Sequence, residues 1–325
     1  MIIIKNDCLD PAFNLAAEEY LIDNLKESAF VLWRNKRAVI VGKNQNTAAE
    51  IDRAFCEKNG IDVIRRLTGG GAVFHDLGNV NYTVIEENSA EKFNNYSLFT
   101  ADVIGYLETL GVKAQLSGRN DILLDGKKIT GNAQCVRNGK IMHHGCILYS
   151  ADLSALSGAL KVNPKKIESK GIKSVSSRVI NICEKLDSKI TVEDFIKGLE
   201  NYVQLKYNCK VRKLSSEEKK KISELADKKY RTFAWNYGES PDYDFNNTVK
   251  FPFGLVSVLY KVSGGVMSDV KIFGDFFGVR DISELEIKLN GVLNREEAVT
   301  SALKGTDIDL FIKGCTVADL IKIFF

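Results

Sequence analysis

Apolar residues near the start of the chain occur in short runs and in one helical pattern. Residues 2–4 predict a first strand, and Asp10-Pro11 offers an N-cap and a first-turn proline to the helix that follows. Apolar residues between Phe13 and Leu21 recur at helical spacing, so this helix is expected to pack on a sheet. Further elements are expected downstream, with strands at residues 30–33, 38–41 and 62–64 and a helix at residues 48–58.

Two dipeptides in the middle of the chain predict β-hairpins. Asp125-Gly126 and Asn138-Gly139 each stand between apolar runs, and both favour the tight turns that reverse a strand. Lys128 is then expected on the returning strand of the first hairpin, and the histidines at 143–144 on the outgoing strand of the second. A helix at about residues 96–110 is expected before this region.

The second half of the chain begins with two capping boxes and ends with an antiparallel pattern. Thr191 with Asp194 and Ser215 with Glu218 have the spacing that opens helices. A polar connector at residues 239–247 then suggests a boundary between a domain of residues 1–246 and a domain of residues 247–325. In the second domain we expect a meander and two or three helices, with strands at residues 248–251, 255–262 and 266–273 and the last helix near residues 316–325.

The most informative segment runs from Arg65 to Tyr82 and contains three consecutive glycines, Gly69 to Gly71. Glycine tolerates positive φ and lets the backbone approach a ligand, and the arginine pair before it can neutralise an anion. The segment lacks both the Gly-Lys-Ser/Thr ending of a Walker A loop and the Gly-x-Gly-x-x-Gly spacing of a dinucleotide site. A mononucleotide loop of another kind remains, and a plain glycine turn in a sheet is the alternative.

Length and charge restrict the class of protein. A chain of 325 residues with 45% hydrophobic residues has enough apolar side chains for one large domain and a smaller one. A net charge of +3 from 45 basic and 42 acidic residues gives little reason to expect a nucleic acid partner.

Cysteines and apolar runs indicate the compartment. Seven scattered cysteines without a Cys-x-x-Cys pair indicate a reducing environment and argue against a zinc site. The N-terminus is charged too early for a signal peptide, and no apolar run approaches the roughly 18 residues of a membrane span. We therefore expect a cytoplasmic protein without a membrane partner.

The remaining polar features allow two interpretations each. The three histidines, His75, His143 and His144, lie in the motif-bearing regions, where each could be functional or a hydrogen-bonded structural residue. The Trp33 side chain could belong to the hydrophobic core or to the wall of a binding pocket. Residues 161–178 are basic, rich in serine and interrupted by Pro164 and Gly171, which predicts an irregular mobile loop.

Taken together, these motifs resemble the lipoate-protein ligase A family. The resemblance rests on the segment Arg65 to Asn79, on Gly118-Arg119-Asn120-Asp121 with Lys128-Ile129-Thr130-Gly131 downstream, and on His143-His144-Gly145. It covers essentially the whole chain, and the part after Trp235 matches loosely. The implied fold is α+β: a large mixed-sheet catalytic domain of the biotin/lipoate protein ligase type, with a small α+β C-terminal accessory domain.

The resemblance also implies an activity. Such an enzyme uses ATP to convert lipoate to lipoyl-AMP, with Mg2+ on the phosphates, and then acylates a lysine of a lipoyl carrier domain. The implied acceptors are lipoyl domains of 2-oxoacid dehydrogenase acyltransferase subunits or the glycine cleavage H protein. The implied enzyme is a monomer.

The site residues follow from the same resemblance. Lys128 is the expected catalytic residue, because it would reach both the lipoate carboxylate and the α-phosphate. ATP is expected at Arg66, Gly69, Gly70, Gly71, Ala72, Val73, Phe74, Lys128 and Arg178. Lipoate is expected at Trp33, Arg65, Thr68, Gly70, His75, Lys128 and His144, and Mg2+ at Asp121.

Three further expectations concern the pocket and its movements. Cys135 stands where a familiar family member carries arginine, which affects the lipoate pocket. The basic loop at residues 161–178 matches the family's adenylate-covering loop, so we expect it to act as a lid. The connector, which contains Pro241, is expected to act as a hinge that lets the small domain move during the cycle.

Two other functions stay open at this point. An acyltransferase of the same superfamily would move octanoyl or lipoyl groups between carriers without ATP, through a thioester on Cys146 beside His144. A non-catalytic lipoate-binding or carrier-docking protein would keep the fold. Lys128 and the intact glycine segment argue against that second alternative.

Overall fold

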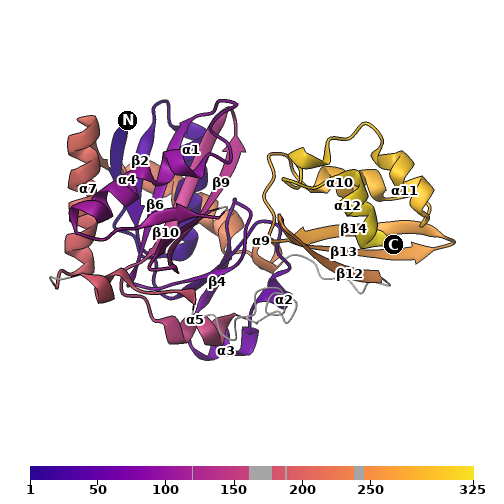
Figure 1. The fold of residues 1–325 in the computed structure, drawn as a ribbon, viewed down its shortest axis with the longest axis horizontal. Coiled ribbons are helices and arrows are strands. Elements are labelled where there is room, and N and C mark those ends of the chain that lie inside the picture. Colours follow the sequence, from indigo (N-terminus) through magenta and orange to yellow (C-terminus); the bar gives the residue numbers. More distant parts are fainter. Residues whose placement is uncertain (119, 161–177, 187–188, 238–244) are drawn as a thin grey trace.

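The computed structural model describes residues 1–118, 120–160, 178–186, 189–237 and 245–325. The chain forms two lobes that lie side by side, and the smaller lobe contains the C-terminal residues (Figure 1). Each lobe combines a sheet with helices, which confirms the expected α+β fold of a large mixed-sheet part and a small accessory part. The expected lid lies outside the described residues except for Arg178. In the described ranges, no helix is both long and apolar enough to span a bilayer.

An eight-stranded mixed sheet is the framework of the larger lobe. Its strands lie in the order β11 (Lys210–Lys213), β1 (Ile2–Lys5), β2 (Ala29–Trp33), β6 (Asn79–Glu87), β10 (Lys140–Leu148), β9 (Lys127–Arg137), β8 (Asp121–Leu124) and β7 (Gln115–Ser117). β1 is parallel to both of its neighbours, and the other pairs are antiparallel. Both predicted hairpins are confirmed, and their turn residues Asp125, Gly126, Asn138 and Gly139 have positive φ, as tight hairpin turns require.

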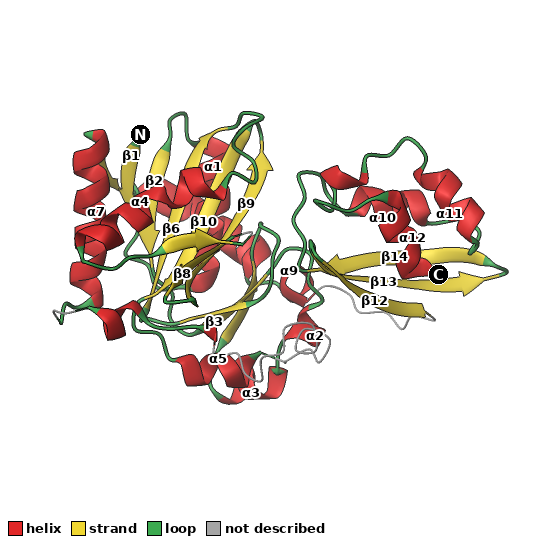
Figure 2. Cartoon of the chain, in the orientation of Figure 1, coloured by secondary structure: helices red, strands yellow, loops and turns green. Residues whose placement is uncertain are grey.

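Helices cover both faces of this sheet (Figure 2). On one face α4 (Tyr96–Thr109) and α7 (Val192–Tyr207) share a core with Ile3, and on the other α1 (Pro11–Asn24) and α8 (Ser216–Leu225) share one with Ile2 and Ile4. Alternate residues of β1 therefore enter two different cores. The predicted caps are present at Asp10, Thr191 and Ser215.

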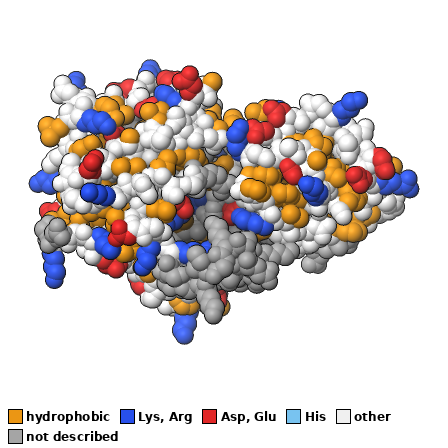
Figure 3. All heavy atoms as spheres, in the orientation of Figure 1, with side chains coloured by type: hydrophobic (Ala, Val, Ile, Leu, Met, Phe, Trp, Pro, Cys, Tyr) orange, Lys and Arg blue, Asp and Glu red, His pale blue; other side chains and the backbone are white. Residues whose placement is uncertain are grey.

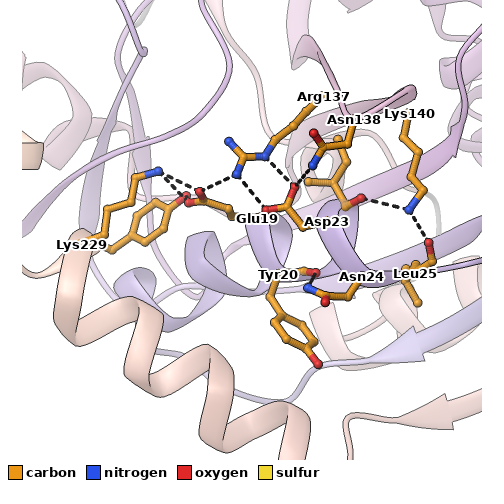
Figure 4. Close-up of polar contacts among 11 residues, drawn as sticks. Glu19, Tyr20, Asp23, Asn24, Leu25, Arg137, Asn138, Lys140 and Lys229 are labelled. Atoms are coloured by element: carbon orange, nitrogen blue, oxygen red, sulfur yellow. Dashed lines mark hydrogen bonds and ion pairs between the residues drawn. The ribbon is translucent and has the colours of Figure 1, made fainter.

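Polar contacts fix α1 against its neighbours (Figure 4). The Glu19 carboxylate accepts from Lys229 at 2.7 Å and lies 3.3 Å from Arg137, while Asp23 accepts from Arg137 at 2.6 Å. Glu19 is buried, so these cations compensate a charge that water does not reach. α1 is thereby held against β9, while Glu18, which precedes Glu19, bonds to Thr83 on β6 and lies against His144 on β10.

A second, three-stranded sheet completes the larger lobe, in the order β4 (Asp62–Arg65), β3 (Ala38–Val41) and β5 (Val73–His75). The glycine segment connects β4 to β5, and α3 (Arg53–Lys58) and α5 (Leu153–Ala159) cover the sheet. The prediction of a single helix at residues 48–58 is wrong. Ile51 separates α2 (Thr47–Glu50) from α3 and forms a β-bridge with Leu160, and the Asp52 side chain caps α3.

The smaller lobe has its own core. β12 (Phe245–Phe251), β13 (Gly254–Ser263) and β14 (Val266–Gly274) form the expected antiparallel meander, which α10 (Ser283–Leu289), α11 (Glu296–Leu303) and α12 (Val317–Phe324) cover. The remaining elements are the short helices η2 (Ile182–Lys185), η3 (Ala226–Tyr230), α9 (Phe233–Tyr237) and η4 (Ile308–Leu310). The division at residue 246 stays a prediction.

The two lobes meet at the glycine segment. Lys43 Nζ lies 2.7 Å from Asp281 Oδ2, and the Gly70 amide donates to the Phe276 carbonyl at 3.4 Å. Because of the Gly70 contact, the small lobe rests directly on the predicted nucleotide loop.

Over the face shown in Figure 3, basic and acidic side chains are interspersed on both lobes.

Candidate active site

A cavity of about 130 Å3 lies between the eight-stranded sheet, the three-stranded sheet and the glycine segment. It is lined by Leu15, Trp33, Ile40, Arg66, Gly70, Gly71, Ala72, Val73, His75, Asn81, Asn120, Lys128, Gly131, Asn132, Ala133, His144, Gly145 and Cys146. Apolar side chains and a few polar groups alternate on this wall, as is usual for small-molecule sites.

Strand register arranges part of the wall in rows. Trp33, Asn81, Cys146 and Gly131 are successive cross-strand partners on β2, β6, β10 and β9. Direct partners share one face of a sheet, and the next row on that face contains His144, about 7 Å along the strands. The wall therefore runs along the strands from the Gly131 row to the His144 row.

Lys128 reaches the cavity across Gly131. Its ammonium lies 2.7 Å from the position that a β-carbon on Gly131 would take, and 2.8 Å from Asp121 Oδ1. The pairing of β8 with β9 shifts by one residue between Ile122 and Leu123, opposite Lys128, and such bulges re-aim side chains. The lysine thus presents a cation at one end of the wall.

Arg66 holds the glycine segment in its conformation. Its guanidinium donates to the carbonyls of Gly69 at 2.6 Å and Gly71 at 2.9 Å, and to Thr68 Oγ1 at 2.9 Å. Burial lowers the pKa of Arg66 to about 10, so the side chain is still a cation at neutral pH. Gly70, between the two bonded carbonyls, has a φ of 92°, which favours glycine.

A chain of buried hydrogen bonds joins Arg66 to Glu18. Thr68 Oγ1, which accepts from Arg66, lies 2.8 Å from His144 Nε2, and His144 Nδ1 lies 2.9 Å from Glu18 Oε1. Glu18 also accepts from Thr83 at 2.6 Å. The carboxylate on α1 is therefore linked to the cation that shapes the glycine segment, and it favours the charged form of that arginine.

A second chain, made of amides, fixes the hydrogen on His75. Asn14 Nδ2 donates to two backbone carbonyls and to Asn35 Oδ1, so Asn35 turns its Nδ2 toward His75 Nδ1 at 3.1 Å. His75 accepts at Nδ1 and therefore carries its hydrogen on Nε2. Burial lowers the pKa of His75 to about 3, and the charge of Arg66 adds to this effect. The ring is neutral and its Nε2 is a donor.

Polar atoms without a partner lie on the cavity wall. His75 Nε2 and both amide atoms of Asn81 are buried and make no hydrogen bond to any described residue. Buried polar groups in folded proteins are almost always hydrogen-bonded, and an unmade bond is costly. These atoms are therefore suited to bind a polar group of a ligand.

The cavity brings together many of the residues expected at the site. Those that line it are Trp33, Arg66, Gly70, Gly71, Ala72, Val73, His75, Lys128 and His144. Thr68, Gly69 and Phe74 do not line it, and Asp121 reaches it through its ion pair with Lys128. Arg178 is next to Val179, which forms a β-bridge with Lys128.

Arg65 points away from the cavity. Its guanidinium donates to the carbonyls of Gly42, Lys43 and Gln45 and, on α9, of Trp235. Successive strand residues point to opposite faces, so Arg65 and its neighbour Arg66 are directed to different sides. A contact of Arg65 with lipoate stays a prediction, and in this structure the side chain ties β4 to α9.

Asn81 was not among the expected site residues, although the sequence contains one signal for it. Asn79, Asn81 and Thr83 alternate with the apolar Val80, Tyr82 and Val84 in a buried strand. A polar stripe of period two in a strand buried on both faces indicates a polar surface inside the protein.

One carboxylate is available for a metal ion. Within the described ranges, no group of three or more His, Cys, Asp or Glu side chains is placed to hold a metal. Asp121 lies beside Lys128 at the edge of the cavity. Because Mg2+ commonly uses one or two carboxylates together with phosphate oxygens, a single aspartate fits an ion that arrives with a nucleotide.

Known proteins resemble the chain along its whole length. Residues 10–204 match the lipoyl protein ligase A/B catalytic domain, and residues 240–324 match the bacterial lipoate protein ligase C-terminus. The chain is 40% identical over 331 residues to lipoate-protein ligase LplJ of Bacillus subtilis, with 100% of both chains covered.

Two solved structures share its fold. The structure of P. falciparum LipL1 in complex with lipoate has a TM-score of 0.80 and 26% identity, with 94% of each chain covered. A structure of lipoate-protein ligase A bound with ATP has a TM-score of 0.63 and 28% identity, and covers 73% of this chain and 98% of that chain.

Proposed function

This chain belongs to the lipoate-protein ligase family, and on that premise we propose how its own residues carry out the reaction. The enzyme activates lipoate with ATP to lipoyl-AMP and transfers the lipoyl group to a lysine of a carrier protein. The observation that carries the residue assignments is the cavity itself, which places the Lys128 ammonium beside both an apolar wall and the glycine segment.

Lipoate lies along the strands, with its dithiolane toward His144 and its carboxylate toward Lys128. Leu15, Trp33 and Ile40 supply apolar surface for the ring and the acyl chain. The separation of about 7 Å between the His144 row and the Gly131 row suits a short acyl chain. Thr68 and Glu18 hold the ring of His144 in place from behind.

ATP lies against the glycine segment from Gly69 to Phe74. A carboxylate oxygen of lipoate attacks the α-phosphorus, an O–P bond forms, and the bond to pyrophosphate breaks with its electron pair on the leaving group. Lys128 stabilises the charge that gathers between the two anions, and Arg66 keeps the loop in shape behind them. Mg2+ would be held by Asp121 and phosphate oxygens, and it would neutralise phosphate charge. Arg178, beside the bridge to Lys128, would contact the nucleotide from the other side.

The acceptors are proposed to be lipoyl domains of 2-oxoacid dehydrogenase acyltransferase subunits or the glycine cleavage H protein. We further propose that the enzyme is a monomer and acts in the cytoplasm. The near-balanced charge of +3 supports a protein acceptor over a nucleic acid.

The acyltransferase alternative through Cys146 is not favoured. Burial raises the pKa of this thiol to about 12, against the opposing effects of the Asn79 hydrogen bond and the Lys128 charge. A thioester-forming cysteine needs a thiolate, which this environment disfavours.

One assay tests the proposed function. Purified enzyme is incubated with lipoate and an apo lipoyl domain, with and without ATP and Mg2+, and lipoyl-AMP and lipoylated carrier are measured by mass spectrometry. We expect both products only with ATP. Carrier lipoylation without ATP would support the acyltransferase, and lipoate binding without either product would support a binding protein.

A further inference from the structure

Asn81 lies on the cavity wall, and its side chain makes no hydrogen bond to any residue that the structure describes. We propose that Asn81, together with His75, binds the acyl oxygen of the substrate: the oxygen that stays on carbon after activation and carries negative charge during transfer. The inference rests on the proposed function and adds a donor pair, separate from Lys128, to the same site.

The Asn81 amide is desolvated and open to a ligand. The residue is 1% exposed and lines the cavity, and neither its Nδ2 nor its Oδ1 has a hydrogen-bond partner among the residues that the structure describes. Exchanging the two amide atoms would not change this, so the conclusion holds for either orientation of the side chain. A desolvated amide of this kind gains a full hydrogen bond when a ligand oxygen arrives.

The tautomer of His75 directs an N–H toward the same cavity. The amides of Asn14 and Asn35 direct a donor at His75 Nδ1, which leaves Nε2 as the only N–H of a neutral ring. That N–H lies on the cavity wall and is also without a described partner. The chain of amides therefore prepares a neutral donor rather than a cation.

Asn81 is also in the right place relative to Lys128. Asn81 belongs to the same cross-strand row as Gly131, over which the Lys128 ammonium lies, with Cys146 between them. Neighbouring strands are about 4.8 Å apart, so Asn81 and Gly131 are about two strand spacings apart on the same wall. A carboxylate in that interval has one oxygen toward Lys128 and the other toward Asn81.

This orientation decides the fate of each oxygen. The oxygen at Lys128 attacks phosphorus and leaves with AMP in the second step. In that step the neutral carrier amine forms a C–N bond to the acyl carbon, and the π electrons of the carbonyl move to the oxygen at Asn81 and His75. When these electrons re-form the carbonyl, the C–O bond to AMP breaks with its electron pair on AMP. The phosphate of AMP or a water molecule accepts the amine proton. Two N–H donors, of which the one on His75 is oriented by Asn14 and Asn35, stabilise the oxyanion between these events.

The test separates the two half-reactions in three variants of the full chain. Asn81→Ala removes the donor, and Asn81→Asp keeps the shape but offers a carboxylate. Thr130→Val is the matched control, because Thr130 Oγ1 is also buried without a described partner but does not line the cavity. Lipoyl-AMP is bound to each variant, apo lipoyl domain is added, and the single-turnover rate of transfer is measured together with the thermal midpoint.

We expect Asn81→Ala to slow transfer by about 10²–10³-fold and Asn81→Asp by at least as much, with Thr130→Val unchanged. The thermal midpoint of Asn81→Ala should change little, because Asn81 makes no side-chain hydrogen bond within the described protein, whereas Asn81→Asp buries a carboxylate and should have a lower midpoint. Transfer by Asn81→Ala near the wild-type rate overturns the inference, and so does a large fall in its midpoint. A wild-type enzyme that makes no lipoyl-AMP from lipoate and ATP overturns the proposed function instead.

Discussion

The ammonium nitrogen of Lys128 lies 2.7 Å from the point where a β-carbon of residue 131 would stand. Glycine at position 131 is thus what allows the lysine to cross the strand and reach the cavity. On its other side the ammonium is held by Asp121 at 2.8 Å, so the cation is positioned from two directions.

Gly131→Ala is expected to disable the lysine without unfolding the protein. The clashing atoms are the flexible end of a side chain, so Lys128 moves and the backbone stays. Unfolding free energy should change by less than about 1 kcal/mol, whereas lipoyl-AMP formation should fall about 100-fold, the usual cost of a 1 Å misplacement. Pyrophosphate release and urea unfolding measure the two quantities.

Lys128→Ala provides the control for this prediction. It should abolish adenylate formation while the fold survives, because the charge is needed mainly in the transition state. The double variant should be no slower than Lys128→Ala alone. An additive loss would show that Gly131 acts independently of the lysine.

Arg66→Lys is expected to loosen the glycine segment. A lysine keeps the charge but cannot donate to the Gly69 and Gly71 carbonyls and the Thr68 hydroxyl at the same time. Each acceptor left without a hydrogen bond costs about 1–3 kcal/mol of folding free energy. The apparent KM for ATP should rise more than that for lipoate in steady-state kinetics. The reverse order would remove Arg66 from the nucleotide side of the site.

Cys146→Ser should leave most ATP-dependent transfer intact. Burial keeps the thiol protonated, and its contact is a hydrogen bond from Asn79 at 3.2 Å, which a hydroxyl can also accept. The measurement is carrier lipoylation in the presence of ATP. An inactive variant, combined with a wild-type acyl-cysteine trapped by mass spectrometry, would favour the acyltransferase.

Stability is expected to fall in mild acid because of His75. The unfolded histidine has a pKa near 6.5 and the folded one about 3, so the unfolded state binds more protons between these values. The free energy of unfolding should therefore drop by about 2 kcal/mol from pH 6.5 to pH 5 on account of this residue. His75→Gln should show a smaller drop in urea titrations at the two pH values; an equal drop would assign the effect elsewhere.

The small lobe is expected to serve transfer more than adenylation. Its core is made entirely of residues beyond 245, so the larger lobe loses no core when the small one is removed. A fragment of residues 1–246, shown to be folded by circular dichroism, should still make lipoyl-AMP but acylate the carrier poorly. Full rates for both steps would contradict a role for movement of this lobe.

Local signals in the sequence predicted much of the fold. Asp125-Gly126 specifies its own turn, and Asp10 caps a helix that begins one residue later, so neither depends on distant parts of the chain. The break between α2 and α3 could not be predicted, because it depends on a β-bridge from Ile51 to Leu160. Such a contact has no local pattern.

Sequence motifs pointed to the parts of the candidate site that lie within one stretch of the chain, but not to contacts between residues that are distant in sequence. Lys128 and the glycine segment follow from their motifs. The donor state of His75 depends on Asn14 and Asn35, which belong to a different part of the chain. The opposite directions of Arg65 and Arg66 depend on which face of β4 is covered, and that is decided by tertiary packing.

The wall of the cavity comes from two sheets that share no strand pairing in the described part of the chain. A substrate that touches Trp33 and Asn81 on one sheet and Ile40 and His75 on the other joins them as a non-covalent cross-link. At a ligand concentration of 100 times Kd, occupancy stabilises a folded protein by about 2.7 kcal/mol. Proteolysis acts on the opened state, so the enzyme is expected to survive longer in cells that contain free lipoate than in cells deprived of it.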